Sequence, residues 1–124
     1  MQHSPGFLKL VNDARQRVRE LTIEQAREWL NKNPSAILID CREEEEYISE
    51  HIKGAIHLCK GIIERDIEKM FPDQNTEMLI YCGGGFRSVL ACESLQKMGY
   101  KNVYSIVGGY RAMKAAGWEM VSGK

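Results

Sequence analysis

Along this chain, short apolar runs alternate with segments whose apolar residues recur at helical spacing. The runs expected as strands cover residues 36–40, 54–58, 78–82 and 103–107. The segments expected as helices between and after them cover residues 43–50, 62–71, 87–98 and 110–116. Strands that alternate with helices form crossover units, which build a mainly parallel sheet covered on both faces. The sequence therefore predicts an α/β fold, and its 124 residues suit one domain.

The first twenty residues carry a separate helical pattern. Their apolar residues at helical spacing are Leu8, Val11, Ala14, Val18 and Leu21. We interpret residues 1–21 as an N-terminal helical extension and residues 22–124 as the domain proper. Thr22, followed three positions later by Gln25, forms a capping-box pattern, so a second helix is expected to begin there and to end near Asn33.

Charge and cysteine content limit the expected partners. The 17 basic and 17 acidic residues leave no net charge to attract nucleic acid. The N-terminal segment has no apolar run long enough for a signal peptide or a membrane span, so we expect a cytoplasmic protein without a membrane partner. The cysteines lack paired metal-ligand spacing, so we expect free thiols and no metal: Cys41, Cys59, Cys82 and Cys92.

The most informative segment begins where the expected strand at 78–82 ends. The strand ends at Cys82, continues into a glycine-rich loop and enters a helix. The loop and the first helical residues are Gly83, Gly84, Gly85, Phe86, Arg87 and Ser88. In an open parallel sheet, ligands bind beyond the carboxyl ends of the strands, where this loop is expected to lie. Cys82 is therefore the candidate nucleophile.

A loop of this kind can stabilise an anion. Successive glycines can turn several backbone N–H groups inward, and a helix N-terminus adds partial positive charge. A thiolate at the centre should have a lowered pKa. Arg87 can add a fixed positive charge or tie the loop down, and the Ser88 hydroxyl can donate to the sulfur or cap a backbone group.

The loop has two other interpretations. A cysteine at a strand end is often a small buried hydrophobic residue, but that role leaves the glycines after Cys82 unexplained. A glycine-rich loop between strand and helix can also bind phosphate. This loop lacks the Gly-Lys-Ser/Thr ending of a P-loop and the spaced glycines of a dinucleotide site, which disfavours nucleotide binding.

Beyond this loop, the chain resembles the rhodanese family from about residue 22 to residue 120. The matching segments are the loop at 82–88, Asp-x-Arg-Glu at 40–43, the Glu-Tyr to Gly-Ala stretch at 46–55, and the glycine-containing pairs at 99–100, 108–109 and 116–117. Departures from the family pattern are Glu50, Lys53 and Met113, where Gly, Pro and Trp are usual. All three lie outside the Cys82 loop.

The resemblance implies a three-layer rhodanese-like fold with a mainly parallel sheet of about five strands flanked by helices, here with an extra N-terminal helix. It implies a sulfurtransferase in which Cys82 takes a sulfane sulfur from thiosulfate or a persulfide. The acceptor would be cyanide or a thiol, which includes a protein thiol, and no cofactor would be needed. It also implies that Asp40 and Arg42 support the structure as a salt bridge, and that His51 belongs to a buried turn.

Several alternatives stay open. The chain could be a non-catalytic interaction module, or a cysteine phosphatase of the related cell-cycle type, which has five residues between its cysteine and arginine where this chain has four. Cys41 is a second thiol near Cys82 only if their strands are neighbours.

The acidic run at 43–46 is interpreted as a solvated helical turn without chemistry. The natural donor and acceptor, the oligomeric state and the role of the N-terminal helix are not specified by the sequence.

Overall fold

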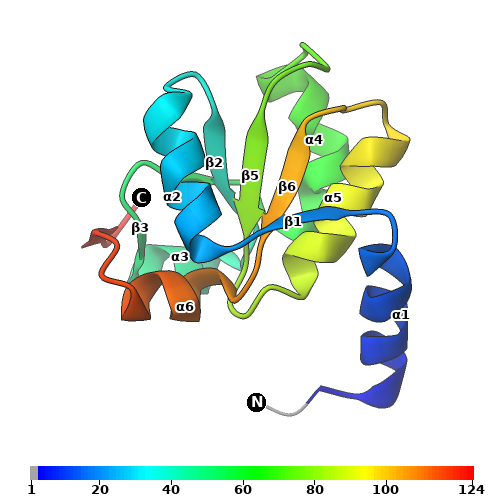
Figure 1. Cartoon of the computed structure of the whole chain (residues 1–124), viewed down its shortest axis with the longest axis horizontal. Coiled ribbons are helices and arrows are strands. Elements are labelled where there is room, and N and C mark those ends of the chain that lie inside the picture. Colours follow the sequence, from blue (N-terminus) through cyan, green and yellow to red (C-terminus); the bar gives the residue numbers. More distant parts are fainter. Residues whose placement is uncertain (1–2) are drawn as a thin grey trace.

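A computed structural model describes residues 3–124 (Figure 1). Its helices are α1 (Pro5–Arg15), α2 (Ile23–Lys32), α3 (Glu44–Ser49), the 3-10 helix η1 (Lys60–Ile62), α4 (Ile63–Met70), α5 (Arg87–Lys97) and α6 (Gly109–Ala115). Its strands are β1 (Arg19–Leu21), β2 (Ile37–Asp40), β3 (His51–Ile52), β4 (Ile56–His57), β5 (Met78–Tyr81), β6 (Val103–Ile106) and β7 (Met120–Val121).

Five strands form one parallel sheet in the order β1-β6-β5-β2-β4. In this order β5 is the central strand, with Ile39 of β2 paired to Ile80 and Ser105 of β6 paired to the same residue from the other side. A separate two-stranded antiparallel sheet joins β3 to β7. The expected α/β fold with a mainly parallel sheet of about five strands is confirmed.

The two faces of the sheet have separate hydrophobic cores. Met78, Ile80 and Cys82 point into the core formed with α1, α4 and α5. Leu79 and Tyr81 point into the core formed with α2 and α6 on the opposite face, which gives the molecule three layers (Figure 1). Burying an aliphatic side chain contributes about 1.5–3 kcal/mol, so a central strand covered on both faces is a near-continuous apolar run.

The expected helix over the first twenty residues is too long. It ends at Arg15, and Arg19–Leu21 form β1, which pairs in parallel with Tyr104 to Ile106 of β6. Pairing gives backbone hydrogen bonds to an otherwise open sheet edge, and this long-range gain overrides the helical spacing of Val18 and Leu21. We keep the boundary between residues 21 and 22 as a proposal, in which the extension contains α1 and the edge strand β1.

The second helix begins as expected. The Thr22 hydroxyl oxygen accepts from the Gln25 N–H at 3.1 Å, and the Gln25 side-chain oxygen accepts from the Thr22 N–H at 2.9 Å. This capping box satisfies two N–H groups at the start of α2. None of the helices within residues 3–124 combines the length and apolar character that crossing a membrane requires.

Candidate active site

Cys82 lies at the carboxyl end of the central strand of the sheet. It follows directly after β5, and residues 83–86 connect it to the first turn of α5 at Arg87. The neighbouring strands β2 and β6 end at the same edge, so their following segments surround the cysteine. The structure therefore brings together the residues of the expected loop, from Cys82 to Ser88.

Two backbone N–H groups point at the sulfur. The Gly85 N–H lies 3.2 Å and the Ser88 N–H 3.4 Å from Cys82 Sγ. Ser88 Oγ is 3.6 Å from the sulfur and 2.7 Å from Ser105 Oγ on β6, which fixes the hydroxyl beside the thiol. These N–H groups form a cradle around the sulfur. Of the three glycines in the loop only Gly85 contributes a contact, and the other comes from Ser88 in the first turn of α5.

Glycines on both sides of Cys82 permit this packing. Gly85 has φ +93°, and a Cβ there would lie 2.9 Å from the backbone nitrogen of Gly108. Gly109 has φ +54°, and a Cβ there would collide with the carbonyl oxygen of Cys82. That carbonyl accepts a 2.7 Å hydrogen bond from the N–H of Tyr110. The start of α6 thus lies directly against the backbone of the candidate nucleophile.

Gly109→Ala should therefore disrupt the site more than an alanine at another left-handed glycine. Gly117 has φ +84° with open space around its Cα, so Gly117→Ala should cost only the backbone strain, about 1–2 kcal/mol. Gly109→Ala adds a collision with rigid backbone, and we expect a loss of about 2–4 kcal/mol in the free energy of unfolding. Urea denaturation of both variants measures the difference. Equal losses would show that α6 can move away from Cys82 freely.

Arg87 ties the loop to α3. Its guanidinium donates to both carboxylate oxygens of Glu46, at 2.9 and 3.1 Å. Glu46 also accepts from the Glu43 N–H at 3.0 Å, and the Arg87 hydrogen bonds hold the pKa of the Glu46 carboxyl below its usual range. The interpretation of the acidic run as purely solvated is wrong at Glu46, because this carboxylate positions the loop.

Cys41 lies directly beside Cys82. Asp40 pairs with Tyr81 in the β2–β5 register, and the Cys41 N–H donates to the Tyr81 carbonyl at 2.9 Å, which makes the next residues neighbours. The condition for a second nearby thiol is therefore met. Cys41 and Cys82 are each 1% exposed, but Cys82 lines the pocket at this end of the sheet and Cys41 does not, so a substrate in the pocket meets Cys82.

Cys82 has a lowered thiol pKa. Hydrogen bonding from the Cys41 thiol is the largest cause and, with hydrogen bonds from Ser88 and Gly85, it outweighs burial and lowers the pKa of Cys82 to about 5. The same pair interaction, together with burial, raises the pKa of Cys41. Burial raises the pKa of Cys59 and of Cys92. Cys82 thus has the lowest thiol pKa of the four cysteines. The glycine loop predicted a lowered pKa, but it did not predict that Cys41 is the largest cause.

Cys41 variants test this cause. Cys41→Val keeps the buried volume but removes the donor, and the loss of one hydrogen bond should raise the pKa of Cys82 by about one unit. Cys41→Ser restores a donor and should leave the pKa near that of the natural protein. Iodoacetamide alkylation followed across pH reads the pKa directly, because only the thiolate reacts. An unchanged profile in Cys41→Val would remove Cys41 from this role.

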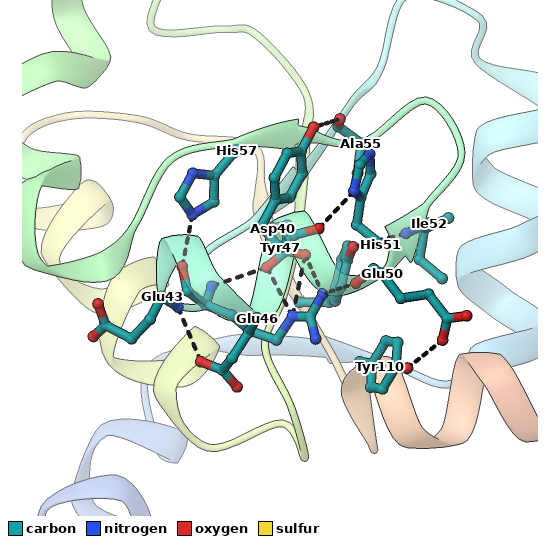
Figure 2. Close-up of polar contacts among 12 residues, drawn as sticks. Asp40, Glu43, Glu46, Tyr47, Glu50, His51, Ile52, Ala55, His57 and Tyr110 are labelled. Atoms are coloured by element: carbon teal, nitrogen blue, oxygen red, sulfur yellow. Dashed lines mark hydrogen bonds and ion pairs between the residues drawn. The ribbon is translucent and has the colours of Figure 1, made fainter. Parts of the chain in front are cut away.

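Asp40 and Arg42 form a buried ion pair beside the site. Arg42 Nη2 lies 2.8 Å from Asp40 Oδ2, and the two side chains are 4% and 0% exposed. Arg42 Nη2 also donates to the Glu50 carbonyl at 2.6 Å, and its guanidinium lies 4.3 Å from the Tyr110 ring centroid. Figure 2 labels Asp40, Glu50 and Tyr110, the residues that Arg42 contacts. The Asp40–Arg42 ion pair therefore joins the end of β2 to the end of α3 and to α6, which lie around Cys82.

His51 packs against Tyr47 of α3. Its Nδ1 is 2.8 Å from the Tyr47 carbonyl oxygen, and its ring stacks on the Tyr47 ring at 3.7 Å between centroids (Figure 2). His51 is buried, but it lies in the strand β3 directly before the turn at residues 53–54, whereas the resemblance implied a position in a buried turn.

Above Cys82 is a pocket of about 420 Å³. The lining residues are His3, Phe7, Glu46, Cys82, Gly83, Gly84, Phe86, Arg87 and Arg111. Sequence reasoning missed Arg111 of α6 and His3 and Phe7 near the start of the chain, since each reaches the pocket only through tertiary packing. Within residues 3–124, no group of three or more His, Cys, Asp or Glu side chains is arranged to hold a metal ion.

The chain is similar to known proteins in sequence and in fold. The family model described as Rhodanese-like domain matches residues 22–116. The thiosulfate sulfurtransferase GlpE of Coxiella burnetii is 34% identical over 86 residues, which are 69% of this chain and 78% of that protein. YrkF of Bacillus subtilis, named as a candidate sulfur carrier, is 32% identical over 94 residues, which are 76% of this chain. The matched part is half the length of YrkF.

A solved structure matches almost the whole chain. It is a Rhodopseudomonas palustris protein of unknown function, described as a possible tyrosine phosphatase. The superposition covers 98% of both chains with a TM-score of 0.84 and 26% sequence identity. The similarity therefore includes the N-terminal segment that precedes residue 22.

Proposed function

The chain belongs to the rhodanese-like domain family, and on that premise we propose that it is a sulfurtransferase in which Cys82 carries a sulfane sulfur as a persulfide. The observation that carries this proposal is the pair of N–H groups, from Gly85 and Ser88, aimed at the sulfur of the cysteine. Such donors stabilise a negative charge on sulfur, and both the thiolate and the persulfide carry that charge.

The first half-reaction loads the cysteine. The Cys82 thiolate attacks the outer sulfur of thiosulfate, a sulfur–sulfur bond forms to Cys82, and the original bond breaks as sulfite leaves with its electron pair. A thiol with a lowered pKa is ionised near neutral pH and needs no separate general base. The cationic side chain of Arg111 lines the same pocket and favours entry of an anionic donor.

The second half-reaction unloads the sulfur. Cyanide or a thiolate attacks the terminal sulfur of the persulfide, the bond to Cys82 breaks, and Cys82 leaves as the thiolate. The leaving thiolate is stabilised by the same N–H groups that stabilised it before loading. No residue in this scheme needs to bind a cofactor. A cytoplasmic location stays a prediction.

Mass spectrometry of the intact protein tests the proposal. Incubation with thiosulfate should add the mass of one sulfur atom at Cys82, and cyanide should remove it and produce thiocyanate. Steady-state rates should follow ping-pong kinetics, because sulfite leaves before the acceptor reacts. If thiosulfate and small persulfides leave the mass unchanged, the chain is a non-catalytic member of the family.

A further inference from the structure

The N-terminal segment forms part of the active-site pocket. His3 and Phe7 line the pocket that contains Cys82, although they lie about eighty residues before it in the sequence. Their contact is with Phe86 of the cysteine loop: the ring centroids of His3 and Phe86 are 4.4 Å apart, and those of Phe7 and Phe86 are 6.2 Å apart. The extension therefore meets the loop that carries the candidate chemistry.

Helix α1 is fixed in this position by its own packing. Val11 and Ala14 are 0% and 1% exposed in the core shared with α5. Beyond the helix, Arg17 Nε donates to Glu93 of α5 at 2.7 Å. Arg15 at the end of α1 places its guanidinium 4.9 Å from the Phe86 ring centroid. These contacts make α1 a stable wall of the pocket.

The pocket is larger than a small inorganic donor requires. Its volume of about 420 Å³ equals the share of about fourteen water molecules at about 30 Å³ each. Thiosulfate has five heavy atoms and would fill a small part of that space. Pockets of several hundred Å³ with aromatic walls and a few polar groups are typical of sites for organic ligands.

The charge in the pocket is asymmetric. Arg87 is neutralised by Glu46. Arg111, on α6, forms no ion pair with any carboxylate in the described part of the chain, from residue 3 to residue 124. Its guanidinium lies over the glycine loop, since a Cβ on Gly84 would lie 2.9 Å from Arg111 Nη1. An anionic group bound there would lie next to the sulfur site.

We propose that this pocket selects organic thiols, and the corresponding persulfides, that carry an apolar body and a carboxylate. The apolar body would contact Phe7 and Phe86, and the carboxylate would bind Arg111 while the thiol sulfur meets Cys82. The proposal rests on the proposed sulfurtransferase function and adds that α1 is a specificity element. An acceptor thiolate attacks the terminal sulfur of the Cys82 persulfide, the bond to Cys82 breaks, and an organic persulfide leaves.

Single-turnover discharge tests the selection. The protein is first loaded with thiosulfate, freed of excess donor, and mixed with mercaptobenzoate, thiophenol or cyanide while intact mass follows the loss of the persulfide. Phe7→Ala should slow both aromatic thiols about fivefold and leave cyanide unchanged. Arg111→Met should slow mercaptobenzoate about tenfold relative to thiophenol. Comparing each variant with the natural protein for one acceptor removes differences in intrinsic thiol reactivity.

Matched variants control for the substitutions themselves. Leu10→Ala shortens an exposed apolar residue of α1. Lys101→Met removes a positive charge just before β6, at the amino-terminal end of the parallel strands, whereas Cys82 lies at their carboxyl end. Neither should change any discharge rate. Phe7→Leu keeps an apolar contact with the core if Phe7→Ala unfolds.

The outcomes separate the two proposals. Failure of the natural protein to load with thiosulfate contradicts the sulfurtransferase function. If the Phe7 and Arg111 variants load normally, and each acceptor discharges their persulfides at the same rate as that of the natural protein, the selection proposed here is contradicted.

Discussion

Replacing Cys82 with serine is expected to abolish sulfur transfer and leave the fold intact. A serine hydroxyl stays protonated near neutral pH and cannot form the persulfide, so turnover should fall by at least about a thousandfold. Serine is nearly isosteric, and its oxygen can still accept from the Gly85 and Ser88 N–H groups. We therefore expect the free energy of unfolding to change by less than about 1 kcal/mol.

The control is Cys59→Ser. Cys59 precedes η1 and contacts Glu43, and it lies outside the pocket, so this variant should keep full turnover. Thiocyanate formation from thiosulfate and cyanide measures activity, and urea denaturation measures stability. Turnover that survives in Cys82→Ser would assign the nucleophile to another residue, and Cys41 is the nearest thiol with which to begin.

The parts of the fold that the sequence predicted correctly depend on local pattern. Met78 to Tyr81 are apolar because both faces of β5 are covered, and the glycines that follow mark the turn into α5. The capping box at Thr22 and Gln25 is likewise a local signal. Such patterns depend on spacing along the chain, so they can be read without knowing what lies nearby in space.

The errors and omissions depend on long-range packing. Val18 and Leu21 fit a helical period, and only the open edge of β6 explains why residues 19–21 become a strand. The two-residue strands β3 and β7 are too short to show an alternating pattern. Their pairing depends on bringing His51 next to Val121.

The candidate site shows the same division. The loop from Cys82 to Ser88 is contiguous, so the sequence predicted its position at the end of a strand. The influence of Cys41 on the pKa of Cys82 depends on strand order, which a single sequence does not give. Phe7 and Arg111 come from opposite ends of the chain and meet only in the folded pocket.

Sulfur chemistry is expected in preference to phosphate chemistry, although the similar Rhodopseudomonas palustris protein is described as a possible tyrosine phosphatase. Four residues separate Cys82 from Arg87, against five in the related phosphatases. The short loop brings the N–H groups of Gly85 and Ser88 within 3.2 and 3.4 Å of the sulfur itself. We infer that these N–H groups leave space for one added sulfur atom directly at Cys82 Sγ and too little for three phosphoryl oxygens there, although the pocket above is larger.

Adding one glycine between Gly85 and Phe86 tests this size argument. Gly85 packs against Gly108, while Ser88 is held by Ser105, so an added residue must displace one side of the cradle. A displacement of about 1 Å in a reacting group can cost about a hundredfold in rate, and we expect at least that loss in persulfide formation from thiosulfate. A glycine added between Pro34 and Ser35, in an exposed loop before β2, is the matched control and should leave the rate unchanged.

Assays of thiosulfate transfer and aryl-phosphate hydrolysis on the same preparations compare the two chemistries. Efficient phosphate hydrolysis by the natural protein, or full sulfur transfer by the lengthened loop, would show that loop size does not select the substrate.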